Sequence, residues 1–367
     1  MKLHIFNPEH DLALAANQTN YTAPHAGRQL RNDLSFIPAL WADEGDLVLV
    51  DDIDSAQDKI RHFGSLYINK VEFITKLQLQ EVFRSTMLVD SVHPWGWDKA
   101  LVSELKALGC PEIMLPQSHL LDQIRNLSSR RWAAENLQRG VLFVDDVDSL
   151  RHILQDKGRA VVKAPWSCSG RGVRYFSCDS SMAVADGLTS GGNLDAFMRW
   201  ASNIIKNQGG VTVEPYYNKV KDFGMEFEVR DGKVNYRGLS LFQTIKGAYT
   251  GNILATEEEK VEMLQPYVSQ AELIEIRNKI VEKVQPVVRS VYGGPFGVDM
   301  MICADGDGKL FVNPCVELNL RRTMGHVALS LGPSEKASLH IMRVEFDGNK
   351  YRLKVLPGQP SEDAPLH

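Results

Sequence analysis

The order of apolar segments in the first third of the chain most constrains its fold. Residues 2–6 and residues 47–50 are short apolar runs typical of buried strands. Between them, large apolar residues recur at helical spacing within residues 27–42, at Leu30, Leu34, Ile37, Leu40 and Trp41. A further helix is expected over residues 97–108. This order of strands and helices predicts an α/β domain with a parallel sheet over residues 1–115.

The sequence signals change after residue 115. Residues 116–138 predict two successive helices, with Ser128 or Ser129 as the N-cap of the second. Beyond residue 141, short strand patterns dominate and are joined by turn residues, which predicts an α+β second half. Residues 336–367 are expected to form a C-terminal hairpin and tail.

Charge and cysteine content exclude several functions. The 367 residues carry 41 Lys and Arg against 46 Asp and Glu, without the basic excess of a nucleic-acid-binding protein. Five cysteines without a C-x-x-C pair argue against a disulfide framework or a thiolate zinc site. No apolar run approaches the ~18 residues of a membrane span, and polar residues directly after residue 6 leave no signal-peptide core. We therefore expect a cytoplasmic protein that binds neither nucleic acid nor membrane.

A predicted strand that ends in Lys163 is followed by a Ser/Gly loop, A-P-W-S-C-S-G-R-G, at residues 164–172. Gly170 and Gly172 allow backbone N–H groups to approach oxygen atoms closely, and the Lys163 ammonium adds a point charge. The loop does not match the Walker P-loop pattern. It indicates a phosphate site, with a Gly-rich hairpin beside a surface lysine as the alternative.

Acidic residues mark the ends of two further strands. Asp299 lies on the first, and Glu317 and Asn319 share one face of the second because side-chain direction repeats every two residues. Two carboxylates and an amide oxygen are hard ligands that suit Mg²⁺. Arg321 follows directly, so the strand end carries both signs of charge. An acidic strand edge that faces water is the alternative.

In this order, the segments resemble the ATP-grasp superfamily over roughly residues 116–331. The strand lysine and its loop come first, V-E-P-Y at residues 213–216 follows as a short linker, and Asp299 and E-x-N-x-R at residues 317–321 come last. The resemblance implies a two-lobed α+β ATP-grasp domain after the N-terminal α/β domain, which would help to bind substrate. We expect this domain at residues 116–335, with a nucleotide lobe at about 116–210 and a C-terminal lobe at about 211–335.

The resemblance also implies roles for single residues. Lys163 would contact the α- and β-phosphates of ATP, and a loop that includes Ser167, Ser169, Gly170 and Gly172 would close over the β- and γ-phosphates. The adenine edge would meet a hinge formed by Glu214, Pro215 and Tyr216, and the ribose would meet Asp222. The ligands of Mg²⁺, or of Mn²⁺ as the alternative metal, would be Asp299, Glu317 and Asn319. Arg321 would steady the transferred phosphoryl group, and Lys246 is expected as a further phosphate ligand and catalytic residue.

Two features depart from the family pattern. The family usually has an upstream lysine in the nucleotide lobe, whereas the corresponding helix here offers only Arg130 and Arg131. Arginine binds phosphate through a planar fork and is no simple replacement for lysine. The interval between Asp299 and Glu317 is also longer than a tight hairpin needs, and a turn at residues 305–308 accounts for the difference.

The activity that this resemblance implies is an ATP- and Mg²⁺-dependent carboxylate–amine ligase. The carboxylate of a small molecule or peptide would become an acyl phosphate, which an amine or similar nucleophile attacks with release of ADP and phosphate. A phosphotransferase or kinase on the same fold and a non-catalytic nucleotide-binding protein are the alternatives, and a homo-oligomer is left open. The polar segment after the first strand offers substrate ligands or turn and capping residues: Asn7, His10, Asp11, His25 and Arg28.

Overall fold

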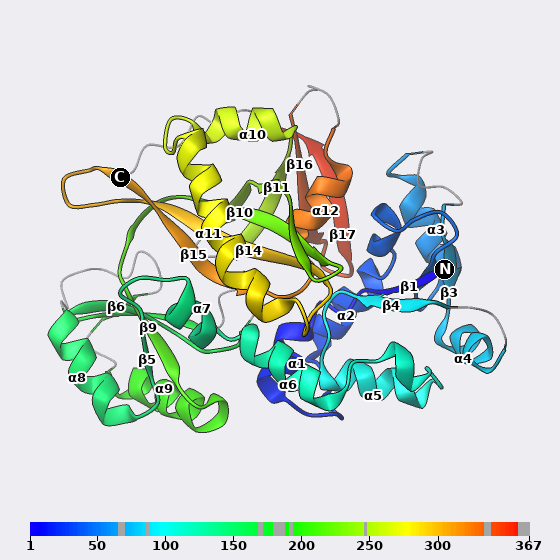
Figure 1. The fold of residues 1–367 in the computed structure, drawn as a ribbon, viewed down its shortest axis with the longest axis horizontal. Coiled ribbons are helices and arrows are strands. Elements are labelled where there is room, and N and C mark those ends of the chain that lie inside the picture. The colour runs from blue at the N-terminus through cyan, green and yellow to red at the C-terminus, as the bar shows by residue number, and fades with distance from the viewer. Residues whose placement is uncertain are drawn as a thin grey trace.

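The computed structural model describes residues 1–64, 70–85, 89–167, 172–178, 188–190, 194–245, 248–333 and 339–358. Within these residues, the strands form four sheets, with the orders β3-β2-β1-β4, β5-β9-β6-β7-β8, β11-β10-β14-β15 and β12-β13-β16-β17. In Figure 1 the N-terminal elements, drawn in blue and cyan, lie beside both later parts of the chain. The candidate site is built where these parts meet.

The first sheet is parallel, as the order of apolar runs predicted. Its strands are β1 (Lys2–Ile5), β2 (Leu47–Leu49), β3 (Glu72–Ile74) and β4 (Ser91–Pro94). The helices are α1 (His10–Ala16), α2 (His25–Leu34), α3 (Ile53–Arg61), α4 (Lys76–Arg84) and α5 (Lys99–Ala107). The apolar spacing within residues 27–42 does not form one continuous helix. α2 ends at Leu34 and the 3₁₀ helix η1 (Ile37–Leu40) follows, since Pro38 has no N–H to continue an α-helix.

The second sheet belongs to the predicted nucleotide lobe. It contains β5 (Leu142–Val144), β6 (Arg159–Lys163), β7 (Val173–Ser177), β8 (Leu188–Ser190) and β9 (Val211–Pro215), with α8 (Val147–Lys157) and α9 (Leu194–Gln208) beside it. The two predicted helices before it are α6 (Ser118–Leu127) and α7 (Arg130–Asn136). Ser129 is the N-cap of α7, because its side chain accepts a hydrogen bond from the backbone N–H of Arg131.

The strand predicted over residues 211–214 is confirmed as β9 (Val211–Pro215), so the V-E-P-Y linker that the resemblance implies overlaps the end of this strand. Val213, Glu214 and Pro215 lie in β9, which pairs antiparallel with β6 and β5. The run V-T-V-E-P is buried along most of its length, and a buried extended segment is stable when neighbouring strands satisfy its backbone groups. Only Tyr216 and Tyr217 separate β9 from β10 (Asn218–Arg230).

The third sheet forms the main core. β10 pairs with β11 (Lys233–Ser240) and with β14 (Gly294–Ala304), which pairs with β15 (Leu310–Asn319), all antiparallel. The Phe227 and Phe296 rings stack at 5.0 Å between centroids, and α11 (Gln270–Val288) supplies apolar residues to the same core. α10 (Glu257–Leu264) and α12 (Met324–Leu331) complete this part. The resulting framework holds the ends of β14 and β15 in fixed register.

The last sheet joins the C-terminal hairpin to the middle of the chain. It contains β12 (Phe242–Ile245), β13 (Ala248–Leu254), β16 (His340–Phe346) and β17 (Tyr351–Pro357). Met342 and Leu353 of this hairpin share an apolar core with Ile37 and Leu40 of the N-terminal domain. The domain bounds drawn from the sequence stay a prediction, although β9 pairs with the nucleotide-lobe strands and the hairpin pairs with β13. No helix in the described ranges is both long and apolar enough to cross a membrane.

Candidate nucleotide and substrate site

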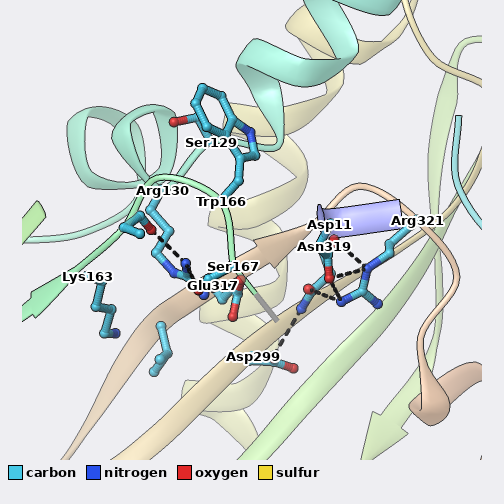
Figure 2. A network of polar contacts seen from close by, with 12 residues as sticks. Asp11, Ser129, Arg130, Lys163, Trp166, Ser167, Asp299, Glu317, Asn319 and Arg321 are labelled. Carbon is cyan, nitrogen blue, oxygen red and sulfur yellow. Dashed lines mark hydrogen bonds and ion pairs between the residues drawn. The ribbon is translucent and has the colours of Figure 1, made fainter. Parts of the chain in front are cut away.

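Three parts of the chain enclose one small pocket. His10 and Asp11 come from α1, Trp166 and Ser167 come from the segment after β6, and residues 317–320 come from the end of β15. The sequence motifs predicted separately for phosphate and for metal therefore meet the polar segment that follows β1. Figure 2 shows the polar contacts among these residues.

Arg130 connects the nucleotide lobe to β15. It is 6% exposed, and its Nη1 donates hydrogen bonds to the Ala164 carbonyl oxygen at 2.7 Å and to Ser167 Oγ at 2.8 Å. Its Nη2 donates to Glu317 Oε1 at 2.6 Å. Arg131, by contrast, is exposed and pairs with Glu135 on its own helix. Of the two arginines considered for the upstream cation, Arg130 is the one that lies at the site (Figure 2).

The segment after β6 is fixed to the helices of the nucleotide lobe. The Trp166 indole N–H donates to the Arg125 carbonyl oxygen at 3.0 Å, and the Arg125 guanidinium lies 3.6 Å from the ring centroid. Gly172 closes the segment, since its carbonyl oxygen accepts from the Ala164 N–H at 2.8 Å. A Cβ atom at Gly172 would lie 2.3 Å from the Cβ of Ser167, so this close approach requires glycine.

Lys163 forms a buried ion pair at the end of β6. Its Nζ lies 2.7 Å from Glu214 Oε2, and the two side chains are 8% and 3% exposed. The pair forms because β6 and β9 are neighbours, with Val161 opposite Glu214 and Lys163 opposite Thr212. The lysine expected to meet phosphate and the glutamate expected to meet adenine therefore contact each other directly.

The three predicted metal ligands converge at the β14–β15 pairing. Asp299 is directly opposite Glu317, and Asn319 Nδ2 donates to Asp299 Oδ2 at 2.9 Å. Burial, together with the negative charges of Glu317 and Glu226, raises the pKa of Asp299 to about 8. Among the described residues, no group of three or more His, Cys, Asp or Glu side chains is placed to hold a metal ion. Any metal here would thus depend on the two carboxylates and the Asn319 amide oxygen.

Asp11 binds Arg321 through hydrogen bonds to one edge of its guanidinium group, the edge formed by Nε and Nη2. Its Nε donates to Asp11 Oδ1 at 2.9 Å, its Nη2 donates to Asp11 Oδ2 at 2.7 Å, and Nη2 also donates to Asn319 Oδ1 at 2.9 Å. Burial alone would raise the pKa of Asp11, but the Arg321 charge and hydrogen bonds hold it below its usual value. Figure 2 shows Arg321 between Asp11 and Asn319.

The remaining predicted residues lie elsewhere or outside the described ranges. Asp222 contacts Lys219 Nζ at 2.7 Å on β10, and the Tyr216 ring packs against the Arg159 guanidinium, 4.1 Å from the ring centroid. Pro215 is the last residue of β9. Ser169, Gly170 and Lys246 lie outside the residues that the structure describes. His25 and Arg28 are exposed on α2, whereas Asn7, His10 and Asp11 are at or beside the pocket.

Two pairings of the pocket residues His10 and Asp11 were not predicted from the sequence. One is Asp11 with Arg321, and the other is His10 with Asp98, whose Nδ1 and Oδ2 are 3.1 Å apart. The pairing of His10 with Asp98 could have been inferred from the sequence order of the strands. β1 and β4 are parallel neighbours, so the residues that follow each strand meet at the same edge of the sheet.

No protein-family model and no curated protein matches the sequence. Solved structures resemble the fold. N5-carboxyaminoimidazole synthetase from Staphylococcus aureus, complexed with ADP, has a TM-score of 0.50 at 14% identity, over 94% of this chain and 82% of that chain. A biotin carboxylase domain from Hydrogenobacter thermophilus, complexed with MgADP and bicarbonate, has a TM-score of 0.48 at 14% identity, over 85% and 72%. An Archaeoglobus fulgidus chain described as an ATP-grasp superfamily protein has a TM-score of 0.46 at 12% identity, over 98% and 100%.

The chain shares its fold with N5-carboxyaminoimidazole synthetase, and the resemblance inferred from the order of its motifs is confirmed at the level of the fold. The fold class is likewise as predicted, a mixed α/β chain with the α/β sheet first.

Proposed function

We propose that this protein is an ATP- and Mg²⁺-dependent ligase that activates a substrate carboxylate as an acyl phosphate. An amine or similar nucleophile would then attack the acyl phosphate, with release of ADP and phosphate. The observation that carries this proposal is the meeting of Arg130, Arg321 and the Asp299–Glu317 pair around one pocket. A site that joins a carboxylate to a triphosphate opposes like charges, and it needs cations on several sides.

The residues present fit a divalent cation. Asp299 and Glu317 are directly opposed carboxylates, and burial followed by the charges of Glu317 and Glu226 raises the pKa of Asp299. Asp299, Glu317 and Asn319 would hold the metal through hard oxygen atoms. When bound there, Mg²⁺ would supply positive charge that offsets the negative charge of the phosphates.

The chain's own cations support the rest of the chemistry. Arg321, oriented by Asp11 through the Nε–Nη2 edge of its guanidinium group, would steady the transferred phosphoryl group. Lys163 and Arg130 would contact the phosphates from the nucleotide-lobe side, and the Ser167 segment would cover them. No covalent protein intermediate is required, because positioning and charge stabilisation supply the catalysis.

Thermal unfolding with a non-hydrolysable ATP analogue, with and without Mg²⁺, tests this proposal. At about 100 times Kd, bound nucleotide adds about 2.7 kcal/mol, and we expect the full rise only when Mg²⁺ is present. Glu317→Ala should lose the Mg²⁺-dependent part, whereas Glu275→Ala, an exposed carboxylate on α11, should keep it. A folded wild-type chain that shows no rise with any nucleotide would contradict the proposal. Equal release of ADP and phosphate then separates a ligase from a phosphotransferase, which retains the phosphoryl group on its product.

A further inference from the structure

His10 is a buried histidine that the proposed nucleotide chemistry does not use. It is 1% exposed at the start of α1, and its Nδ1 lies 3.1 Å from Asp98 Oδ2. The same Asp98 oxygen accepts a hydrogen bond from Asn7 Nδ2 at 3.3 Å, while Asp98 Oδ1 accepts from the Leu101 N–H at 2.9 Å. An ionised carboxylate only accepts hydrogen bonds, so His10 Nδ1 is the donor. The neutral ring therefore carries its lone pair on Nε2.

The Nε2 atom of His10 is buried and has no hydrogen-bond partner among the described residues. Buried polar atoms almost always have a hydrogen-bond partner, so an unpaired polar atom at a pocket indicates a ligand-binding position. His10 lines the same pocket as Glu317 and Asn319, so it lies beside the predicted metal site. Its neighbour Asp11 is the residue that holds Arg321.

The ring of His10 is also fixed in position. A Cβ atom at Gly96 would lie 2.5 Å from His10 Cδ2, so the ring packs directly against this glycine. Asn7 Nδ2 holds the Gly96 carbonyl oxygen at 2.9 Å, which secures the backbone behind the ring. Asp98 binds one ring nitrogen and Gly96 packs against the face of the ring, so the ring and its Nε2 atom are held in one orientation.

We propose that His10 is the base that accepts a proton from an amine nucleophile in the second half of the ligase reaction, an inference that rests on the proposed function. The amine nitrogen would form a C–N bond to the acyl carbon, the C–O bond to phosphate would break, and the amine proton would move to His10 Nε2. Asp98 is a positioning residue that stabilises the resulting imidazolium. The carboxylates of Asp11 and Glu317 line the same pocket as His10.

The first test is independent of turnover. Long-range ¹H–¹⁵N spectra of the labelled full chain, with the His10 signals assigned by His10→Gln, report which ring nitrogen carries the proton. We expect the proton on Nδ1 and an unprotonated Nε2 at pH 8. A proton on Nε2 would overturn the inference. Asp98→Asn, which preserves an N-cap for α5, should move the proton to Nε2 because the new amide can donate to Nδ1.

The second test measures hydroxamate and ADP formation from Mg·ATP, hydroxylamine and a panel of amino acids, hydroxy acids and short peptides. His10→Gln should lose about 10²-fold or more in hydroxamate formation while keeping the thermal shift with nucleotide. Asp98→Asn should also lose activity and change the pH profile, and His119→Gln, an exposed histidine of α6, should not. Full activity of His10→Gln would refute the role of His10 as the base and would leave the ligase proposal standing. If the wild-type chain binds nucleotide but none of the tested acids leads to ADP formation, both the ligase proposal and this role of His10 are refuted.

Discussion

The buried pair Lys163–Glu214 offers a quantitative test of how the nucleotide lobe is built. Lys163 Nζ lies 2.7 Å from Glu214 Oε2, and Glu214 Oε1 has no hydrogen-bond partner among the described residues. Lys163→Met therefore leaves a buried carboxylate that has lost its cation. Removing one member of a buried pair costs about 3–5 kcal/mol, because the remaining charge is neither hydrated nor compensated.

The expected shift in melting temperature follows from chain length. At about 2.1 cal/mol/K per residue, the unfolding entropy of 367 residues is about 0.8 kcal/mol/K. A loss of about 3–5 kcal/mol then lowers Tm by about 4–6 °C when the chain unfolds as one unit. Lys163→Met combined with Glu214→Leu removes both charges and should recover most of this loss, since replacing a buried pair with apolar groups is often neutral or stabilising.

The assay is thermal unfolding in nucleotide-free buffer, with Lys279→Met as the control. Lys279 pairs with Glu275 on the surface of α11, and both side chains are 64% exposed. Its loss should cost at most about 0.5 kcal/mol, or less than about 1 °C. The reasoning fails if Lys163→Met melts within about 1 °C of the wild-type chain. It also fails if the double variant is as unstable as the single one, because the two charges would then not be coupled.

Three further predictions concern the same site. Gly172→Ala should lower the free energy of unfolding by about 1–3 kcal/mol, because the new Cβ atom would overpack against Ser167. In the control Gly306→Ala, no atom lies within 4 Å of the new Cβ, and the free energy of unfolding should change by no more than about 0.5 kcal/mol. Equal urea midpoints for the two variants would contradict this prediction. Asp11→Asn should cost about 1.5–3 kcal/mol at pH 7. Arg321 lowers the pKa of Asp11 in the folded chain, so the stability that Asp11 contributes is present above the ordinary pKa near ~3.9 and is lost as the pH falls through the pKa of the folded chain. The difference in urea midpoint between the wild-type chain and Asp11→Asn should therefore be smaller at pH 3 than at pH 7. Arg130→Lys should lower Tm and reduce the Mg·ATP shift, since an ammonium cannot reproduce the contacts to Ala164, Ser167 and Glu317, while Arg131→Lys should change neither.

Local pattern was sufficient to predict much of the framework. The strand at the start of the chain, the Ser129 cap and the Asp231-Gly232 turn between β10 and β11 follow from backbone preferences of nearby residues. Asp231 and Gly232 both have positive φ, at 53° and 70°, as such a turn requires. The opposed positions of Asp299 and Glu317 follow from a two-strand pattern alone. These features depend on contacts within one or two neighbouring elements.

The site's partners depend on contacts that no local pattern contains. Asp11 and Arg321 are 310 residues apart, and Arg130 and Glu317 are 187 apart. Their pairing depends on how α1, α7 and β15 pack, which is set by apolar cores rather than by the charged residues themselves. The contact between Lys163 and Glu214 was not predicted for a related reason: the strand pattern at residues 211–214 does not show which strand pairs with it.

The cations of the candidate site share one property that bears on ligand binding. Lys163, Arg130 and Arg321 each contact a carboxylate of another element, namely Glu214, Glu317 and Asp11. A buried charge is stable only when it is compensated, so these pairs maintain the site in the absence of anions. A triphosphate that enters must compete with those carboxylates for the same cations. Since Glu317 is also a predicted metal ligand, a divalent cation bound there would weaken its hold on Arg130. We therefore expect metal and nucleotide to bind cooperatively, with nucleotide affinity measured by calorimetry rising when Mg²⁺ is added and rising less in Glu317→Gln.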